Sequence, residues 1–313
     1  MGLEMKDKIT RRNFIKASLG TALSLSLPHM GLSDLFAQTL REKEIIPDLA
    51  VVTDGDAALM TRQAIELLGG MRRFVSKGDV VVVKPNIGWD RSPEQAADTN
   101  PQVVAEVVKL CLESGAKKVK VFDRSCNTAN RCYEHSGIKK AASDAGAEVS
   151  YVVDAGFSKM KLPQGEVLKQ WPLYKPALEA DILINVPIAK NHGLTYLTMG
   201  IKNLMGIMGG DRGKIHWSID DKLADLANFV RPQLTILDAY RILVKNGPQG
   251  GSLKDVRMKK TIIAGTQIAT VDAYGATLFG MKPAGLKHIV KSSKLGLGEI
   301  DLSKVNIKKV SLG

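Results

Sequence analysis

Short β-branched runs alternate with longer stretches of helical periodicity from Asp48 to the end of the chain. Runs such as Val80-Val81-Val82-Val83 are apolar without interruption, as in strands that are buried on both faces. Strands are predicted at residues 49–53, 79–84, 118–123, 148–153, 181–186, 234–238, 260–264 and 305–310. This alternation predicts an α/β fold with a mostly parallel sheet covered by helices.

Helices are predicted between these strands, at residues 56–68, 101–114, 133–145, 220–229 and 271–279. The helix at 101–114 has the clearest boundaries, because Asn100 is a good cap, Pro101 fits the first turn and Gly115 follows the end. A small hairpin insertion is predicted at residues 159–168, around Pro163-Gln164-Gly165. We therefore expect a single α/β domain over residues 48–313.

The first 37 residues have the order of an export signal. Arg11-Arg12 is followed by Asn13-Phe14-Ile15-Lys16 and then by an apolar stretch from Ala17 to Leu27. This stretch is far shorter than the roughly 20 residues that cross a bilayer, so it predicts no stable membrane span. We expect the twin-arginine translocase to export the protein, with cleavage after Ala37 and a linker over 38–47. The localisation would be periplasmic or otherwise extracytoplasmic; the alternative is an ordinary basic N-terminus.

The chain is basic, with 44 Lys and Arg against 32 Asp and Glu and a net charge of +12. Residues 1–37 carry five Lys and Arg and three Asp and Glu, so their removal leaves a net charge of +10. A basic exported protein suggests an anionic ligand, an acidic partner or an anionic membrane face. Nucleic acid is not expected, because the sequence holds no motif that recognises it.

The three cysteines leave several roles open. Cys111 falls near the apolar face of the helix predicted at 101–114, where a buried free thiol is expected. Cys126 and Cys132 lie in a polar loop and are compatible with a disulfide, with a metal cluster that includes His135, or with neither. Three cysteines without a CxxC pair do not make the usual four-thiolate iron-sulfur site. The cofactor is therefore unknown, with a metal ion as one option.

Polar residues stand at the carboxyl ends of four predicted strands. Lys84 ends one strand and Asn86 follows it, Asp123 ends another, and Asn185 and Asp238 lie at the ends of two more. In an open α/β sheet, ligands bind outside the carboxyl ends of the strands. We therefore expect one polar crevice there; the alternative is that these residues only cap helices and turns.

Residues 188–216 are rich in glycine and in cationic side chains. Lys190, Lys202, Arg212 and Lys214 offer positive charge to a phosphate or carboxylate, and glycines let the backbone approach a ligand closely. The segment is not a Walker A loop, because Met208 stands where that motif needs glycine. A GxGxxG dinucleotide motif is also absent from the sequence. The prediction is an anion pocket.

Histidines supply the candidate proton-transfer groups. His192 and His216, with Asp123 or Asp238, would make an acid-base pair or a metal site, although no close histidine spacing supports metal. His288 is expected on an exposed, basic helix face. Asp272 falls in the first turn of a helix, where it either complements the helix dipole or reaches into the pocket.

Five segments resemble the bacterial and archaeal family called domain of unknown function 362. They span residues 81–88, 99–125, 180–208, 215–240 and 268–283. The resemblance implies that the motif positions of the family are occupied by Lys84, Asn86, Asp123, Lys190, His192, Lys202, Asn203, His216, Asp238 and Asp272. Some relatives carry cysteine-rich ferredoxin-like motifs, which this chain lacks.

Two functions fit these observations. In the first, an exported enzyme or cofactor-dependent protein holds an anionic small molecule through Lys190 and Lys202. His192 or His216 would then move a proton. Asp123 or Asp238 would orient a histidine or bind a cation. The other ligand-binding candidates are Lys84, Asn86, Asn203, Arg212, Lys214 and Asp272. The alternative is a non-catalytic module that binds a ligand or docks on a redox partner.

Overall fold

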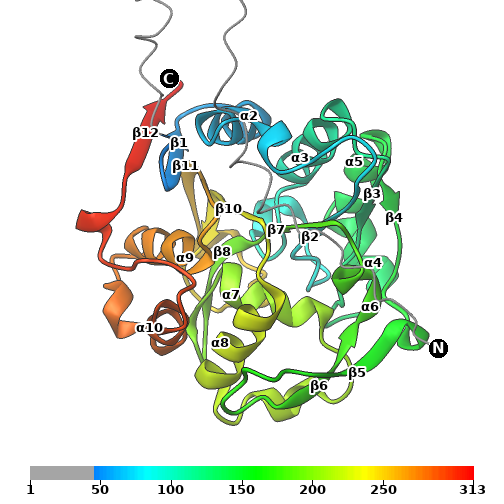
Figure 1. The fold of residues 1–313 in the computed structure, drawn as a ribbon. Helices are drawn as coiled ribbons and strands as arrows, with labels where there is room; N and C mark the ends of the chain where they lie inside the picture. Colours follow the sequence, from blue (N-terminus) through cyan, green and yellow to red (C-terminus); the bar gives the residue numbers. More distant parts are fainter. Residues whose placement is uncertain (1–45) are drawn as a thin grey trace, which may run out of the picture. The chain divides into compact units, whose positions relative to one another are not determined.

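A computed structural model describes residues 46–313, in which ten strands form one sheet (Figure 1). The strand order along its main path is β12-β1-β11-β10-β7-β2-β3-β4. These strands are β1 (Leu49–Thr53), β2 (Val80–Pro85), β3 (Lys118–Val121), β4 (Glu148–Val149), β7 (Ile182–Val186), β10 (Leu234–Leu243), β11 (Val256–Gly265) and β12 (Ile307–Ser311). The predicted export signal lies outside the described residues and stays a prediction.

The sheet is mostly parallel, as the sequence predicts. Strands β4, β3, β2, β7 and β10 form a continuous parallel block, and β12 pairs with β1 in parallel. Along this main path β11 is the exception, because it runs antiparallel to both β1 and β10. The carboxyl ends of β2, β3, β7 and β10 therefore lie at the same edge, where the candidate site forms.

Helices cover both faces of the sheet. Successive residues of one strand point to opposite faces, and Ala50 and Val52 accordingly belong to one core cluster while Leu49 and Val51 belong to another. The first cluster lies under α2 (Ala57–Leu67), α3 (Pro101–Glu113), α4 (Ala129–His135) and α5 (Ile138–Asp144). The second includes residues of α7 (Gly200–Asn203), α8 (Ile219–Val230), α9 (Ile268–Thr277) and α10 (Lys287–Lys294). The short helix α6 (Lys175–Leu178) precedes β7.

Local signals explain several helix boundaries. The side chain of Asn100 accepts a hydrogen bond from the backbone N–H of Gln102, and Pro101 is the first residue of α3, as predicted. The single helix predicted at 133–145 is wrong, because the chain forms α4 and α5 on either side of Gly137, whose φ is 72°. That left-handed conformation ends one helix and starts the next.

The structure also changes two other expectations. The hairpin is confirmed but is longer than predicted, since β5 (Phe157–Lys161) pairs with β6 (Gln170–Tyr174). His288 is not on an exposed face: it is 1% exposed, and its Nδ1 lies 3.2 Å from a carboxylate oxygen of Asp220. In α10, His288 therefore faces α8, whereas Lys287 and Lys294 are exposed to solvent. Within residues 46–313, no helix has the length and apolar character that a bilayer crossing requires.

The sequence pattern does not reveal β8 (Ile188–His192) and β9 (Tyr196–Thr198). These strands form an antiparallel pair, and β8 also pairs with β10. Strand β8 follows β7 after only Pro187. Its pairing carries Lys190 and His192 from the end of the parallel block into the candidate site.

Candidate anion-binding site

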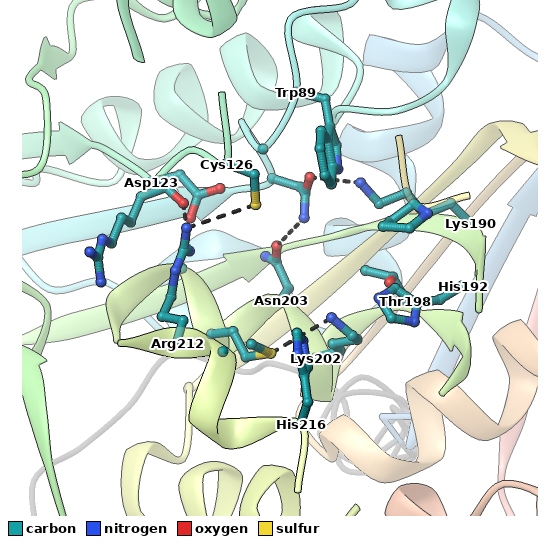
Figure 2. A pocket seen from close by; sticks show the side chains of 17 residues that line it. Trp89, Asp123, Cys126, Lys190, His192, Thr198, Lys202, Asn203, Arg212 and His216 are labelled. Carbon is teal, nitrogen blue, oxygen red and sulfur yellow. Dashed lines mark hydrogen bonds between the residues drawn. The ribbon is translucent and has the colours of Figure 1, made fainter. Parts of the chain in front are cut away.

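A cavity of about 280 Å³ lies beyond the carboxyl ends of β2, β3 and β7, between the loops that follow them and the segment from β8 to His216 (Figure 2). Eight of the twelve predicted site residues line it: Asn86, Asp123, Lys190, His192, Lys202, Asn203, Arg212 and His216. Residues far apart in the chain therefore meet at one rim of the sheet.

A buried ion pair forms one wall of the cavity. The Nζ of Lys84 lies 2.7 Å from Oδ1 of Asp123, and the two side chains are 0% and 3% exposed. Burial lowers the pKa of Lys84, and the negative charge of Asp123 opposes that shift. The second carboxylate oxygen of Asp123 accepts the backbone N–H of Ile87 at 2.7 Å. The pair thus ties the end of β3 to the loop after β2.

Gly206 passes directly over this ion pair. A Cβ atom at position 206 would lie 1.7 Å from Oδ1 of Asp123 and 2.5 Å from Nζ of Lys84. No side chain fits in that space, so glycine is required for the backbone after α7 to approach the pair. This close approach brings Lys202 and Met205 to the cavity.

A chain of amide groups joins β2, β7 and α7 under the cavity. The side chain of Asn86 donates to Oδ1 of Asn203 at 2.9 Å, and Asn203 donates to Oδ1 of Asn185 at 2.8 Å. Asn185 in turn donates to the carbonyl of Gly200 at 3.0 Å. These bonds satisfy the buried amides and fix the orientation of the groups that line the site.

Lys190 is a buried cation beside a buried acid. Its Nζ donates to Oδ1 of Asn86 at 3.0 Å and to the carbonyl of Ala97. Burial lowers the pKa of Lys190 to about 8, and the charge of Asp98 opposes the shift. Burial raises the pKa of Asp98 to about 7, although the backbone N–H of Trp89 donates to it at 2.9 Å. Burial thus disfavours the charged form of both groups.

His192 is held in one neutral form. Its Nδ1 accepts the backbone N–H groups of Leu194 at 3.0 Å and Thr195 at 3.3 Å. Burial, followed by the charges of Lys202 and Lys190, lowers its pKa to about 3. Because Nδ1 acts as the acceptor, the hydrogen of the neutral ring is on Nε2. The ring thus offers an N–H donor.

The side chains of Lys202 and Thr198, both in the lining, make no hydrogen bond to an oxygen atom within the described residues. The ammonium of Lys202 contacts the sulfur of Met205 at 3.6 Å as its one hydrogen-bond partner in residues 46–313. The hydroxyl of Thr198 is buried there without any partner. Burial, and then the charge of Lys190, lowers the pKa of Lys202 to about 8. A ligand oxygen would satisfy both groups.

Two arginines and a second histidine complete the polar lining. Arg212 donates to the carbonyls of Arg124 and Ser125, both at 2.9 Å, and Arg124 donates to the carbonyl of Met208 at 2.9 Å. His216 is exposed, and burial and the charge of Lys202 lower its pKa. Asp123 is the one acidic residue in the lining, and Lys84 already neutralises it.

Three of the predicted site residues lie away from the cavity, and Lys84 lies behind its wall. Lys214 is exposed and points elsewhere. Asp238 accepts the backbone N–H groups of Asn100 at 2.7 Å and Tyr240 at 3.0 Å, so its oxygens contact no histidine. Asp272 accepts those of Gly200 at 2.7 Å and Ile201 at 2.9 Å, at the start of α7. These two carboxylates position the backbone around the site.

The cysteine loop forms neither a disulfide nor a cluster. Cys126 and Cys132 are free thiols, as is the buried Cys111. Cys126 lines the cavity, 3.8 Å from the guanidinium of Arg212, while Cys132 faces the carbonyl of Gly88. His135 pairs with Asp90 instead of a cysteine. In the described part of the chain, His, Cys, Asp and Glu do not gather in threes that would hold a metal ion.

The sequence analysis missed several residues of this site, among them Trp89, Thr198 and Asp98. Trp89 and Thr198 line the cavity, and Asp98 lies beside Lys190. Asp98 comes just before Asn100-Pro101, and these residues were interpreted only as the start of a helix. Thr198 lies on β9, a strand that the sequence did not predict.

Sequence comparisons identify a family and a relative of this chain. A family model described as "Domain of unknown function (DUF362)" matches residues 81–277. The thylakoid-associated protein sll1697 of Synechocystis is 27% identical over 259 residues, which cover 78% of this chain and 76% of that protein.

Two solved structures are similar to parts of the chain. The lactate racemase apoprotein from Thermoanaerobacterium thermosaccharolyticum aligns with a TM-score of 0.46 and 14% identity, covering 73% of this chain and 56% of that one. A protein from Thermotoga maritima aligns with a TM-score of 0.41 and 10% identity, covering 73% and 60%. The chain thus spans less than two thirds of either structure. Because the family model matches well over half of its residues, the chain belongs to the DUF362 family.

Proposed function

We propose that the cavity binds a small molecule through a carboxylate or phosphate group. The observation that carries the proposal is Lys202, a largely enclosed ammonium whose one hydrogen-bond partner in the described residues is a thioether sulfur. A cation in such surroundings is costly unless an anion accompanies it. Lys190, Arg212 and the unpartnered hydroxyl of Thr198 lie in the same lining. An anionic ligand would supply the missing acceptors.

The same groups suit proton transfer on the bound molecule. Lys190 and Lys202, each with a pKa of about 8, lose and gain a proton near physiological pH, as general acids and bases must. His192, with a pKa of about 3, is too weak a base for this role and serves instead as a neutral N–H donor to a developing oxyanion. The lysines are therefore the proposed proton carriers, and His216 at the rim is a third candidate.

The alternative function, a non-catalytic ligand-binding module, uses the same anion site. The two differ in what happens to the ligand, since only an enzyme returns it changed. Native mass spectrometry of the protein from its own source would identify a co-purified molecule. Incubating that molecule with fresh protein then separates the two functions.

The role of His192 gives a direct test of the site. We expect His192→Phe to weaken the binding of inorganic sulfate, measured by titration calorimetry at pH 7, by roughly 5- to 10-fold, because one N–H donor to an anion is lost. His192→Gln, whose amide keeps an N–H, should recover part of the affinity. In nitrogen-15 spectra of the wild-type protein, the ring should remain neutral from pH 5 to 8. Imidazolium signals of the His192 ring at pH 6, or a sulfate affinity of His192→Phe equal to that of the wild-type protein, would contradict the proposed role.

Export through the twin-arginine route is part of the proposal. The supporting observation is the order Arg11-Arg12-Asn13-Phe14-Ile15 before an apolar stretch. One relative is named as thylakoid-associated, which is compatible with a place outside the cytoplasm. Replacing both arginines by lysine should leave the protein in the cytoplasmic fraction at full precursor length. Equal export of the two forms would exclude this route.

A further inference from the structure

The lining of the cavity includes apolar side chains as well as cationic ones. Trp89, Met205 and Pro248 contribute to its lining together with the charged groups. Figure 2 shows Trp89 on one side of the pocket and Lys202 and His216 on the other. The lining thus offers separate surfaces to two parts of one ligand.

Trp89 lies outside the hydrophobic core of the described residues. It is half-buried and, within residues 46–313, belongs to none of the hydrophobic clusters of the core. A large aromatic side chain that lines a cavity without packing in the core leaves part of its apolar surface open to that cavity. Burying that surface against a ligand would be favourable.

The loop that carries Trp89 is fixed before any ligand arrives. The backbone N–H of Trp89 donates to Asp98 at 2.9 Å, and the carbonyl of the preceding Gly88 accepts the N–H of Cys126 at 2.8 Å. The hydroxyl of Ser125 donates to the carbonyl of Ile87 at 2.6 Å. The backbone that carries the indole is therefore held in place, which lowers the entropy cost of stacking against the ring.

We propose that the ligand of this cavity carries a flat aromatic ring next to its anionic group, and that the ring lies against Trp89. This inference rests on the proposed function, because the anionic group is the part held by Lys202. The cavity, at about 280 Å³, lies at the small end of the range for ligand sites, roughly 300–1,000 Å³. Its size favours a single-ring acid or phosphate ester over a dinucleotide.

Three carboxylates of equal charge test the inference by titration calorimetry at pH 7. Benzoate presents an aromatic ring, cyclohexanecarboxylate a non-aromatic ring of similar size, and acetate neither. We expect benzoate to bind roughly tenfold more tightly than acetate, with cyclohexanecarboxylate in between. In Trp89→Ala the advantage of benzoate should shrink to about twofold, and Trp89→Phe should keep most of it.

The control variant is Trp217→Ala, which removes an indole that is 77% exposed and does not line the cavity. It should leave the ratio of benzoate to acetate affinity unchanged. Equal binding of benzoate and acetate, or an unchanged ratio in a folded Trp89→Ala protein, overturns the aromatic inference while the anion site stands. If none of the three carboxylates and no sulfate binds, the proposed function fails as well. A thermal melt of each variant confirms that it is folded.

Discussion

Replacement of Asp123 by asparagine is expected to lower the free energy of unfolding by about 3–5 kcal/mol. The substitution keeps the shape of the side chain and an oxygen for the N–H of Ile87, but it leaves the ammonium of Lys84 without its counter-charge. Lys84 is fully buried, so water does not replace the lost partner. Urea denaturation at pH 7, followed by circular dichroism, measures the loss.

Two further variants show whether the loss comes from the buried charge. Adding Lys84→Met to Asp123→Asn removes the uncompensated ammonium and should recover a substantial part of the stability. Asp144→Asn breaks the pair of Lys140 and Asp144 on the surface, where the side chains are 78% and 63% exposed, and should change stability little. A stability of Asp123→Asn equal to that of wild type would mean that Lys84 is neutral in the folded protein.

The sequence predicted the fold well because burial on both faces leaves a clear pattern. An uninterrupted run such as Val80–Val83 is typical of a strand buried on both faces, and the structure has such a strand there. Strand β8 escaped prediction because Lys190 and His192, the two groups that make it functional, are also the polar residues that interrupt its apolar pattern.

Polar residues at strand ends identified the site. They did not show which carboxylates line the cavity and which only accept backbone N–H groups. Asp123 and Asp238 both follow apolar runs, yet one lines the cavity while the other binds backbone N–H groups before α3. That difference depends on which loops meet at the sheet edge. The contact of Lys190 with Asn86, 104 residues away, likewise follows from strand order, which local sequence does not encode.

Lys202→Met is expected to weaken the binding of inorganic sulfate by roughly 30- to 150-fold, equivalent to about 2–3 kcal/mol for a hydrogen bond between charged groups. Methionine keeps the length and apolar stem of the side chain and can still pack on Met205, so the variant removes the charge alone. Lys214→Met is the matched control, because Lys214 is exposed and lies outside the cavity lining. Titration calorimetry at pH 7 should give the same sulfate affinity for Lys214→Met as for the wild-type protein.

The pH dependence of the same binding separates a charge effect from a packing effect. Lys202 has a pKa of about 8 in the free protein, lowered by burial and then by Lys190, so it is cationic below pH 8 and neutral above it. The charge of sulfate does not change in this range. Sulfate affinity should therefore be constant from pH 6 to 7 and fall above pH 8. The fall should be about tenfold per pH unit if one lysine loses its proton. It should be steeper if Lys190, whose pKa is also about 8, loses its proton as well. In Lys202→Met the decline should be shallower, because one titrating group is gone. An affinity that stays flat from pH 7 to 9.5 in the wild-type protein would show that neither lysine holds the anion.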